Sequence, residues 1–168
     1  VINQDDINET VVNYRTVLES YSPDLISLNE YSDIMGDYSD KKYITRDVLF
    51  YDYNYAYIGV QNNYSCNSLI SAIHLKNIRY NSFTCNKTAQ ITHTSLIKAN
   101  DYYYISSLFY KKKKKINLIS THLAFDENNP LIAQAQIEEL IDKYKDCEYV
   151  ILCGDWNSPS EFYDIFKN

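Results

Sequence analysis

Hydrophobic and polar positions along the chain follow two different periods, which predict two kinds of element. Apolar residues recur at helical spacing in residues 7–21 and 130–145, so we expect a helix in each. The shared faces contain Ile7, Val11, Leu18 and Tyr21 in the first helix, and Ala133, Ile137, Leu140, Ile141 and Tyr144 in the second. Asp6 followed by Glu9 is typical of a helix N-cap, and Pro130 suits a first helical turn.

Short apolar or alternating segments bounded by turn residues predict strands. We expect strands at residues 25–30, 55–61, 67–73, 102–110, 116–123 and 149–153, with one or two more between 78 and 98. The stretch from 33 to 54 has no clear period, and we predict a helix around 41–51. This order of helix, strand, block of strands, helix and strand favours sheets covered by helices over a helical bundle.

The size and composition of the chain restrict the class of protein to which it can belong. Its 168 residues are 45% hydrophobic and 23% charged, which fits one domain with a sizeable core. Four cysteines lack a close pair, so neither a zinc site nor a disulfide framework is indicated. Because there is no apolar run of about 18 residues, we expect no transmembrane segment. The chain begins with Val rather than Met, and the compartment, cytoplasmic or secreted, stays open.

The charge of the chain is acidic but unevenly distributed. A net charge of -6 argues against binding nucleic acid by bulk charge alone, but not against a nuclease that neutralises phosphate with a metal ion. Five lysines, Lys111–Lys115, separate two predicted strands. They are either a solvated hairpin end that opposes edge-to-edge aggregation or a phosphate-binding patch. Charge runs at loop tips are usually solvated, which favours the first interpretation.

Three predicted strands end on polar side chains that are capable of chemistry. The first ends at Glu30, the second at Thr121-His122, and the third at Asp155-Trp156-Asn157. Taken singly, each has a structural explanation: a surface acid, a hydrogen-bonded core histidine, and a turn. Strand ends are also where a rigid scaffold presents groups to a cleft, so the repetition indicates a site.

These residue types together fit phosphoryl chemistry. A carboxylate supplies hard oxygen to Mg²⁺, and the metal ion stabilises charge on a phosphoryl group. A second carboxylate orients or deprotonates water, an asparagine amide donates to a phosphate oxygen, and a histidine donates a proton near neutral pH. If the backbone stays extended, the side chains of Asp155 and Asn157 lie on the same side, because strand periodicity is two.

Five segments resemble, in order, motifs of the endonuclease/exonuclease/phosphatase superfamily, whose fold is that of deoxyribonuclease I. The segments are PDLISLNE (Pro23–Glu30), NSLISAI (Asn67–Ile73), INLISTHL (Ile116–Leu123), AQAQIEEL (Ala133–Leu140) and VILCGDWN (Val150–Asn157). They are similar to the superfamily's PDI-x-x-LQE, GNAILSR, THL, R-x-x-Q-x-x-x-L and GDFN motifs, and they cover nearly the whole chain. Any one match is weak, but five in the family's order are specific.

The resemblance implies an α+β fold: a four-layer α/β/β/α sandwich of two packed mixed sheets flanked by helices, incomplete here. It implies a hydrolase, a phosphoesterase that depends on Mg²⁺, or alternatively Mn²⁺, and uses in-line attack of water without a covalent intermediate. Carried over by motif, Glu30 is the metal ligand, His122 the acid or transition-state stabiliser, and Asp155 the residue that orients water. Asn157 binds the scissile phosphate, and Asn67 supports the substrate site.

The chain departs from the superfamily's pattern at both ends. The family's first strand, which ends in an asparagine near the metal, and its closing Ser-Asp-His motif have no counterpart here. Only 11 residues follow Asn157, and none is histidine. The resemblance therefore predicts that residues 1–168 are a single domain truncated at both ends, and weakly active or inactive alone. Asn29, Ala72 and Ala133 stand where the family has glutamine, arginine and arginine.

Two functions stay open at this point. The first is phosphoester hydrolysis by a monomer, with nucleic acid, phospholipid or inositol phosphate not distinguished as the substrate. The alternative is a catalytically inactive interaction domain that keeps the sandwich. The missing terminal histidine favours this alternative, whereas the retention of Glu30, His122, Asp155 and Asn157 argues against it.

Overall fold

The structure of the protein, a computed structural model, describes residues 4–31, 34–35, 43–44, 49–58, 66–85, 102–124 and 131–157. The helices in these ranges are α1 (Gln4–Tyr21) and α4 (Leu131–Tyr144). The strands are β1 (Leu25–Tyr31), β2 (Ile34–Met35), β3 (Tyr43–Ile44), β4 (Tyr55–Ile58), β5 (Cys66–Ser71), β6 (Lys76–Ser82), β7 (Tyr103–Lys111), β8 (Lys114–His122) and β9 (Val150–Asp155). Neither described helix combines the length and the apolar character needed to cross a membrane.

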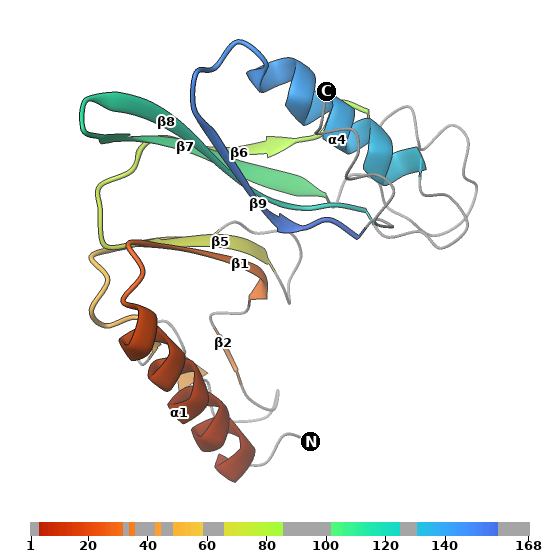
Figure 1. The fold of residues 1–168 in the computed structure, drawn as a ribbon. Helices are drawn as coiled ribbons and strands as arrows, with labels where there is room; N and C mark the ends of the chain where they lie inside the picture. The colour runs from red at the N-terminus through yellow and green to blue at the C-terminus, as the bar shows by residue number, and fades with distance from the viewer. Residues whose placement is uncertain are drawn as a thin grey trace.

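Two sheets form the centre of the molecule. The three-stranded sheet has the order β1-β5-β4 and is antiparallel. The four-stranded sheet has the order β6-β7-β8-β9 and is mixed, because β8 and β9 run parallel. Figure 1 shows α4 against the outer side of the four-stranded sheet and α1 beyond the three-stranded sheet, so the layers are helix, sheet, sheet and helix. The predicted α+β sandwich of two packed sheets flanked by helices is confirmed.

Alternation along the strands divides the apolar residues between the two faces of the four-stranded sheet. Ile119 packs with Ile137 of α4, whereas Leu118 and Ile105 pack with Leu69 of β5 between the sheets. None of these five side chains is more than 3% exposed. Burying each one contributes about 1.5–3 kcal/mol, so this packing holds the layers together.

The two helices agree with their predicted apolar faces to different degrees. The face of α4 is confirmed, since Ala133, Ile137 and Leu140 are each 1% exposed. In α1, Leu18 is buried in a cluster with Ile70 of β5. Tyr21 is 79% exposed, so its predicted place on the buried face is wrong. The helix ends at this residue, and the chain leaves it directly afterwards.

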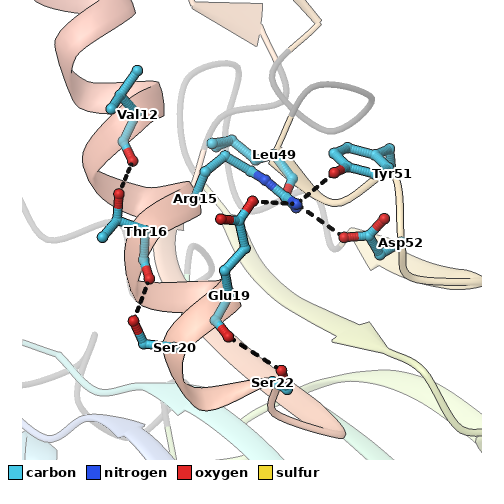
Figure 2. A network of polar contacts seen from close by, with 9 residues as sticks. All are labelled: Val12, Arg15, Thr16, Glu19, Ser20, Ser22, Leu49, Tyr51 and Asp52. Atoms are coloured by element: carbon cyan, nitrogen blue, oxygen red, sulfur yellow. Dashed lines mark hydrogen bonds and ion pairs between the residues drawn. The ribbon is translucent and has the colours of Figure 1, made fainter.

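Arg15 connects α1 to the segment that precedes β4 (Figure 2). Its Nη1 donates to the carbonyl of Leu49 at 3.0 Å, and its Nη2 donates to Oδ2 of Asp52 at 2.9 Å. Nη2 also lies 2.8 Å from the hydroxyl of Tyr51, whose ring centre is 4.2 Å from the guanidinium carbon. The hydrogen bond to Asp52 raises the pKa of Arg15. A polar contact therefore supplements the apolar packing of this helix.

Several local predictions differ from the structure. Helix α1 already includes Gln4, so Asp6 lies inside the helix and is not its N-cap. The helix predicted around 41–51 is wrong at its start, where β3 pairs with β2. Tertiary pairing overrides local propensity in such short segments. Positions 45–48 lie outside the described residues, as does the 86–98 part of the stretch predicted to hold further strands.

Candidate active site

The parallel pairing of β8 and β9 brings two polar strand ends to the same edge. Parallel neighbours need a crossover connection, and α4 lies between these strands in sequence. The register puts His122 opposite Asp155, with 3.9 Å between Nε2 and Oδ2. The His122 side chain is 12% exposed and lies edge-on to the ring of Tyr102, whereas the Asp155 side chain is 51% exposed. A shielded imidazole thus lies beside a carboxylate that is open to solvent.

The chain turns directly after Asp155. Oδ1 of Asp155 accepts a hydrogen bond from the backbone N–H of Asn157 at 3.0 Å, and Asn157 has a φ of 45°. The backbone is therefore not extended from Asp155 to Asn157, so the condition for placing both side chains on the same side is not met. The segment is instead a turn, the other interpretation of this sequence, because an aspartate that bonds the N–H two residues later closes a turn. Nδ2 of Asn157 donates to the carbonyl of Leu123 at 2.9 Å. This bond joins the turn after β9 to the residue that follows β8.

Gly154 allows β9 to approach β8 closely. Its φ is 144°, and a Cβ at this position would lie 1.8 Å from the carbonyl oxygen of Thr121. No side chain fits at that distance, and the backbone conformation is one that favours glycine. The glycine is therefore required by the strand pairing itself.

Asn29 joins the three-stranded sheet to the end of β8. Its Nδ2 donates to the carbonyl of Thr121 at 2.8 Å and to Oδ1 of Asn67 at 2.7 Å. Nδ2 of Asn67 donates in turn to the carbonyl of Tyr103 at 2.7 Å. Asn67 is 2% exposed and bonded within the protein at both ends of its amide. This geometry favours a supporting role for Asn67 over direct contact with a substrate.

Glu30 follows Asn29 in β1. The pairing of β1 with β5 shifts register between Leu28 and Tyr31, so the backbone of Glu30 belongs to an irregular strand end. Irregularities of this kind are frequent beside active sites, where they redirect a side chain. Through Asn29, the backbone of Glu30 lies near the Thr121-His122 end of β8. The side chain of Glu30 lies outside the described residues.

Two residues that fix this edge were not predicted to do so. In the sequence, Asn29 is distinguished only as a departure from a family motif. Gln136 of α4 is fully buried, and its Oε1 accepts the N–H of Ala124 at 2.8 Å, just after His122. Both are amides within largely apolar segments, and that sequence context is the signal that could have identified them.

The donor atoms at this edge suit a metal ion that takes few protein ligands. Among the described residues, no group of three or more His, Cys, Asp and Glu side chains could hold a metal ion. Mg²⁺ keeps several waters and is usually bound by one or two carboxylates together with substrate phosphates. Asp155 presents an exposed carboxylate here, and the backbone of Glu30 lies at the same edge. Asp155 thus offers a carboxylate oxygen of the kind that Mg²⁺ accepts.

The layers and strand order define a fold class. The chain has a deoxyribonuclease I-like fold, which the resemblance of the five motifs predicted. No protein-family model matches the chain, and no curated protein matches it by sequence.

Particular solved structures share this fold at low sequence identity. The chain is similar to the human Nocturnin catalytic domain, with a TM-score of 0.67 and 18% identity over 96% of this chain and 62% of that one. It is similar to D. rerio TDP2 carrying 14 humanising mutations, with a TM-score of 0.66 and 16% identity over 97% and 61%. It is also similar to ANGEL2, a 2′,3′-cyclic phosphatase, with a TM-score of 0.63 and 16% identity over 89% and 43%. The chain thus spans less than two thirds of the length of each of these three chains.

Proposed function

We propose that this edge of the sandwich is the active site of a metal-dependent phosphoesterase, which hydrolyses its substrate by in-line attack of water. The observation that carries the proposal is the double hydrogen bond of Asn29. It draws the end of β1 against Thr121 while the strand register sets His122 beside Asp155. Three polar strand ends from distant parts of the chain therefore share one edge, as a site on a rigid scaffold requires.

Asp155 orients the attacking water. The N–H of Asn157 fixes its Oδ1 at 3.0 Å, and the half-exposed side chain leaves Oδ2 able to accept from water. His122 lies 3.9 Å away and donates a proton or a hydrogen bond to a phosphoryl oxygen. One N–H of the Asn157 amide is held by Leu123, and its second N–H binds the scissile phosphate.

Glu30 holds the metal ion, which is Mg²⁺ or Mn²⁺. When bound, the ion stabilises negative charge on the phosphoryl oxygens. Asn29 fixes the backbone next to Glu30, and Asn67 fixes Asn29 in turn. Few protein ligands are needed, because water and substrate phosphate complete the coordination of Mg²⁺.

The substrate class that we propose is a nucleic acid. D. rerio TDP2 was solved in complex with a single strand DNA product, and the chain is similar to that structure with a TM-score of 0.63 and 15% identity over 94% of this chain and 57% of that one. ANGEL2 is a 2′,3′-cyclic phosphatase. Because the net charge is -6, affinity for the substrate comes from the site and its metal ion rather than from the overall charge.

The test is hydrolysis of bis(p-nitrophenyl) phosphate and of a labelled single-stranded oligonucleotide, with Mg²⁺, with Mn²⁺ and with EDTA. We expect weak turnover that requires the divalent ion and falls at least about 100-fold in Asp155→Asn and in His122→Ala. The matched control is Asp146→Asn, an exposed acid after α4 that should keep full activity. Circular dichroism confirms that the variants fold.

Two outcomes would contradict the proposal. One is turnover that survives EDTA, and the other is turnover that is unchanged in both site variants. If the protein binds no divalent ion and turns over neither substrate, the alternative of an inactive interaction domain is supported instead.

A further inference from the structure

A cationic surface lies at the opposite end of the strands from the candidate active site. Strand β7 begins at Tyr103, beside Asn67, and ends at Lys111, while β8 returns from Lys114 to His122. Nine strand residues span about 30 Å, so the hairpin end and His122 are separated by most of the length of the sandwich. Figure 1 shows the turn between β7 and β8 projecting at one side of the sheet, away from the end of β9. We call Lys111–Lys115 the lysine hairpin.

The lysine hairpin is unfavourable for the local backbone. Lys112 and Lys113 form the two-residue turn with φ values of 51° and 66°. Asn and Gly are the residues that such turns favour, since left-handed φ strains other side chains. Lys111 and Lys114 are cross-strand partners, and like charges in this arrangement repel. The sequence therefore keeps positive charge where local structure favours other residues, which is a pattern typical of functional segments.

Most of this charge is not neutralised within the described part of the chain. Lys111 is 3.5 Å from Asp24, and Lys114 donates to the hydroxyl of Tyr149. Lys112, Lys113 and Lys115 are exposed and have no ion-pair partner among the described residues. In a chain of net charge -6, the lysine hairpin is thus a local region of opposite sign.

Tyrosine rings flank the lysine hairpin on both sides. The Nζ atom of Lys114 lies 4.4 Å from the ring centre of Tyr149, and that of Lys76 lies 5.4 Å from the ring centre of Tyr110. Tyr110 is 55% exposed. A hollow of about 380 Å³ adjoins this ring and is lined by Asp24, Ile73, His74, Lys76, Phe109, Tyr110 and Lys111. The surface therefore combines cations with an exposed aromatic ring and a neighbouring recess.

We propose that the lysine hairpin and Tyr110 form a binding surface for single-stranded nucleic acid. Lysines contact successive phosphates while a base stacks on the Tyr110 ring and reaches the hollow beside Lys76, which is how strands are held without sequence preference. A membrane surface fits less well, because insertion needs apolar side chains and the turn carries only lysines. The proposal is independent of hydrolysis, since the surface lies at the other end of the strands.

The test is fluorescence anisotropy of a labelled oligothymidylate of about 15 nucleotides, titrated in EDTA at several salt concentrations. We expect the triple variant Lys112→Gln/Lys113→Gln/Lys115→Gln to bind at least about 10-fold more weakly and to reduce the slope of log K against log salt by about 2. Tyr110→Ala should weaken binding by about 5- to 100-fold with little change in that slope, because stacking releases no counterions.

The controls separate this surface from general charge and from the active site. Lys145→Gln removes an exposed lysine outside the hairpin and should bind the oligonucleotide like the wild type. It is compared with the single variant Lys113→Gln, which removes the same charge from within the hairpin. The triple variant should hydrolyse bis(p-nitrophenyl) phosphate like the wild type. Unchanged affinity and salt slope in the triple variant would overturn the proposal. Tighter binding to anionic phospholipid vesicles than to the oligonucleotide, lost in the same variant, would assign the surface to a membrane instead.

Discussion

Nδ2 of Asn29 lies 2.7 Å from Oδ1 of Asn67, and this contact links β1 to β5 at the edge where the candidate site lies. The same Nδ2 reaches the Thr121 carbonyl in β8, and Asn67 reaches the Tyr103 carbonyl in β7. Two amides thus join four strands of both sheets. A shielded amide that lacks a hydrogen-bond partner destabilises the fold, so each of the two side chains depends on the bond to the other. The pair therefore fixes how the sheets meet beneath the site.

Removing either amide should destabilise the protein. Asn29→Ala leaves Oδ1 of Asn67 and the Thr121 carbonyl without this donor, so we expect a loss of about 1–3 kcal/mol in the free energy of unfolding. Asn67→Ala should cost a similar amount, and the double variant should cost less than the sum, because the two share one bond. Urea denaturation measures all three. Asn54→Ala, at an exposed position, is the matched control, and strictly additive losses would contradict the coupling.

Gly154 should be intolerant of any side chain. In Gly154→Ala the added Cβ meets the Thr121 carbonyl, and the backbone conformation is strained, so we expect at least about 3 kcal/mol of destabilisation. Lys112→Gly is the backbone control, since it relieves a left-handed φ and should change stability by less than about 1 kcal/mol. Equal denaturation midpoints for Gly154→Ala and the wild type would show that β8 and β9 are not this close.

Glu139 should make stability depend on pH in the acid range. Burial opposes its charge, but hydrogen bonds from the N–H groups of Cys85 and Thr84 and from the Thr84 hydroxyl outweigh it and lower the pKa of Glu139. Because the pKa of Glu139 is lower in the folded state, its contribution to stability is complete above the unfolded-state pKa. That contribution is lost as pH falls through the folded-state pKa. The urea denaturation midpoint of the wild type should therefore decrease as pH drops below about 4.5, and this decrease should be smaller in Glu139→Gln. Glu138→Gln, which removes the neighbouring exposed carboxylate in contact with Gln134, is the matched control.

Tyr104 should contribute an alkaline transition. Burial raises the pKa of Tyr104 to about 12, and the side chain is fully buried against Phe83. A raised folded-state pKa means that the neutral phenol stabilises the fold below the ordinary value of about 10, and that this contribution is lost as pH rises from about 10 to about 12. Tyr104→Phe should remove this part of the alkaline loss of stability. A wild-type denaturation midpoint that stays constant over that range would contradict the assignment.

The elements that the sequence predicted well are those with a clear local pattern of apolar residues. The face of α4 follows from its contact with one cluster, so the helical period identifies it. Strands β7 and β8 are buried on both faces of their sheet, so their apolar, β-rich composition identifies them. The lysine run was correctly assigned to a hairpin end, because two β-rich segments flank it.

The parts that the sequence missed depend on contacts between distant residues. A turn at Asp155–Asn157 is one interpretation that the sequence offers, but the hydrogen bond from the Asn157 amide to the carbonyl of Leu123, 34 positions earlier, cannot be predicted from a local pattern. The role of Asn29 depends on a carbonyl 92 positions away. The five ordered motifs predicted the fold correctly, but by motif Asn29 is only a departure, whereas in the structure it joins the two sheets.

The central claim is that one divalent ion lies where the ends of β1, β8 and β9 meet. Titration with Mn²⁺, followed by paramagnetic broadening of backbone amide signals in NMR spectra, tests it without any assay of activity. We expect broadening confined to residues 29–31, 121–123 and 155–157, abolished in Glu30→Gln and retained in the control Asp24→Asn. Broadening centred instead on the exposed acids Glu19, Asp24 and Asp52, or unchanged in Glu30→Gln, would contradict the account.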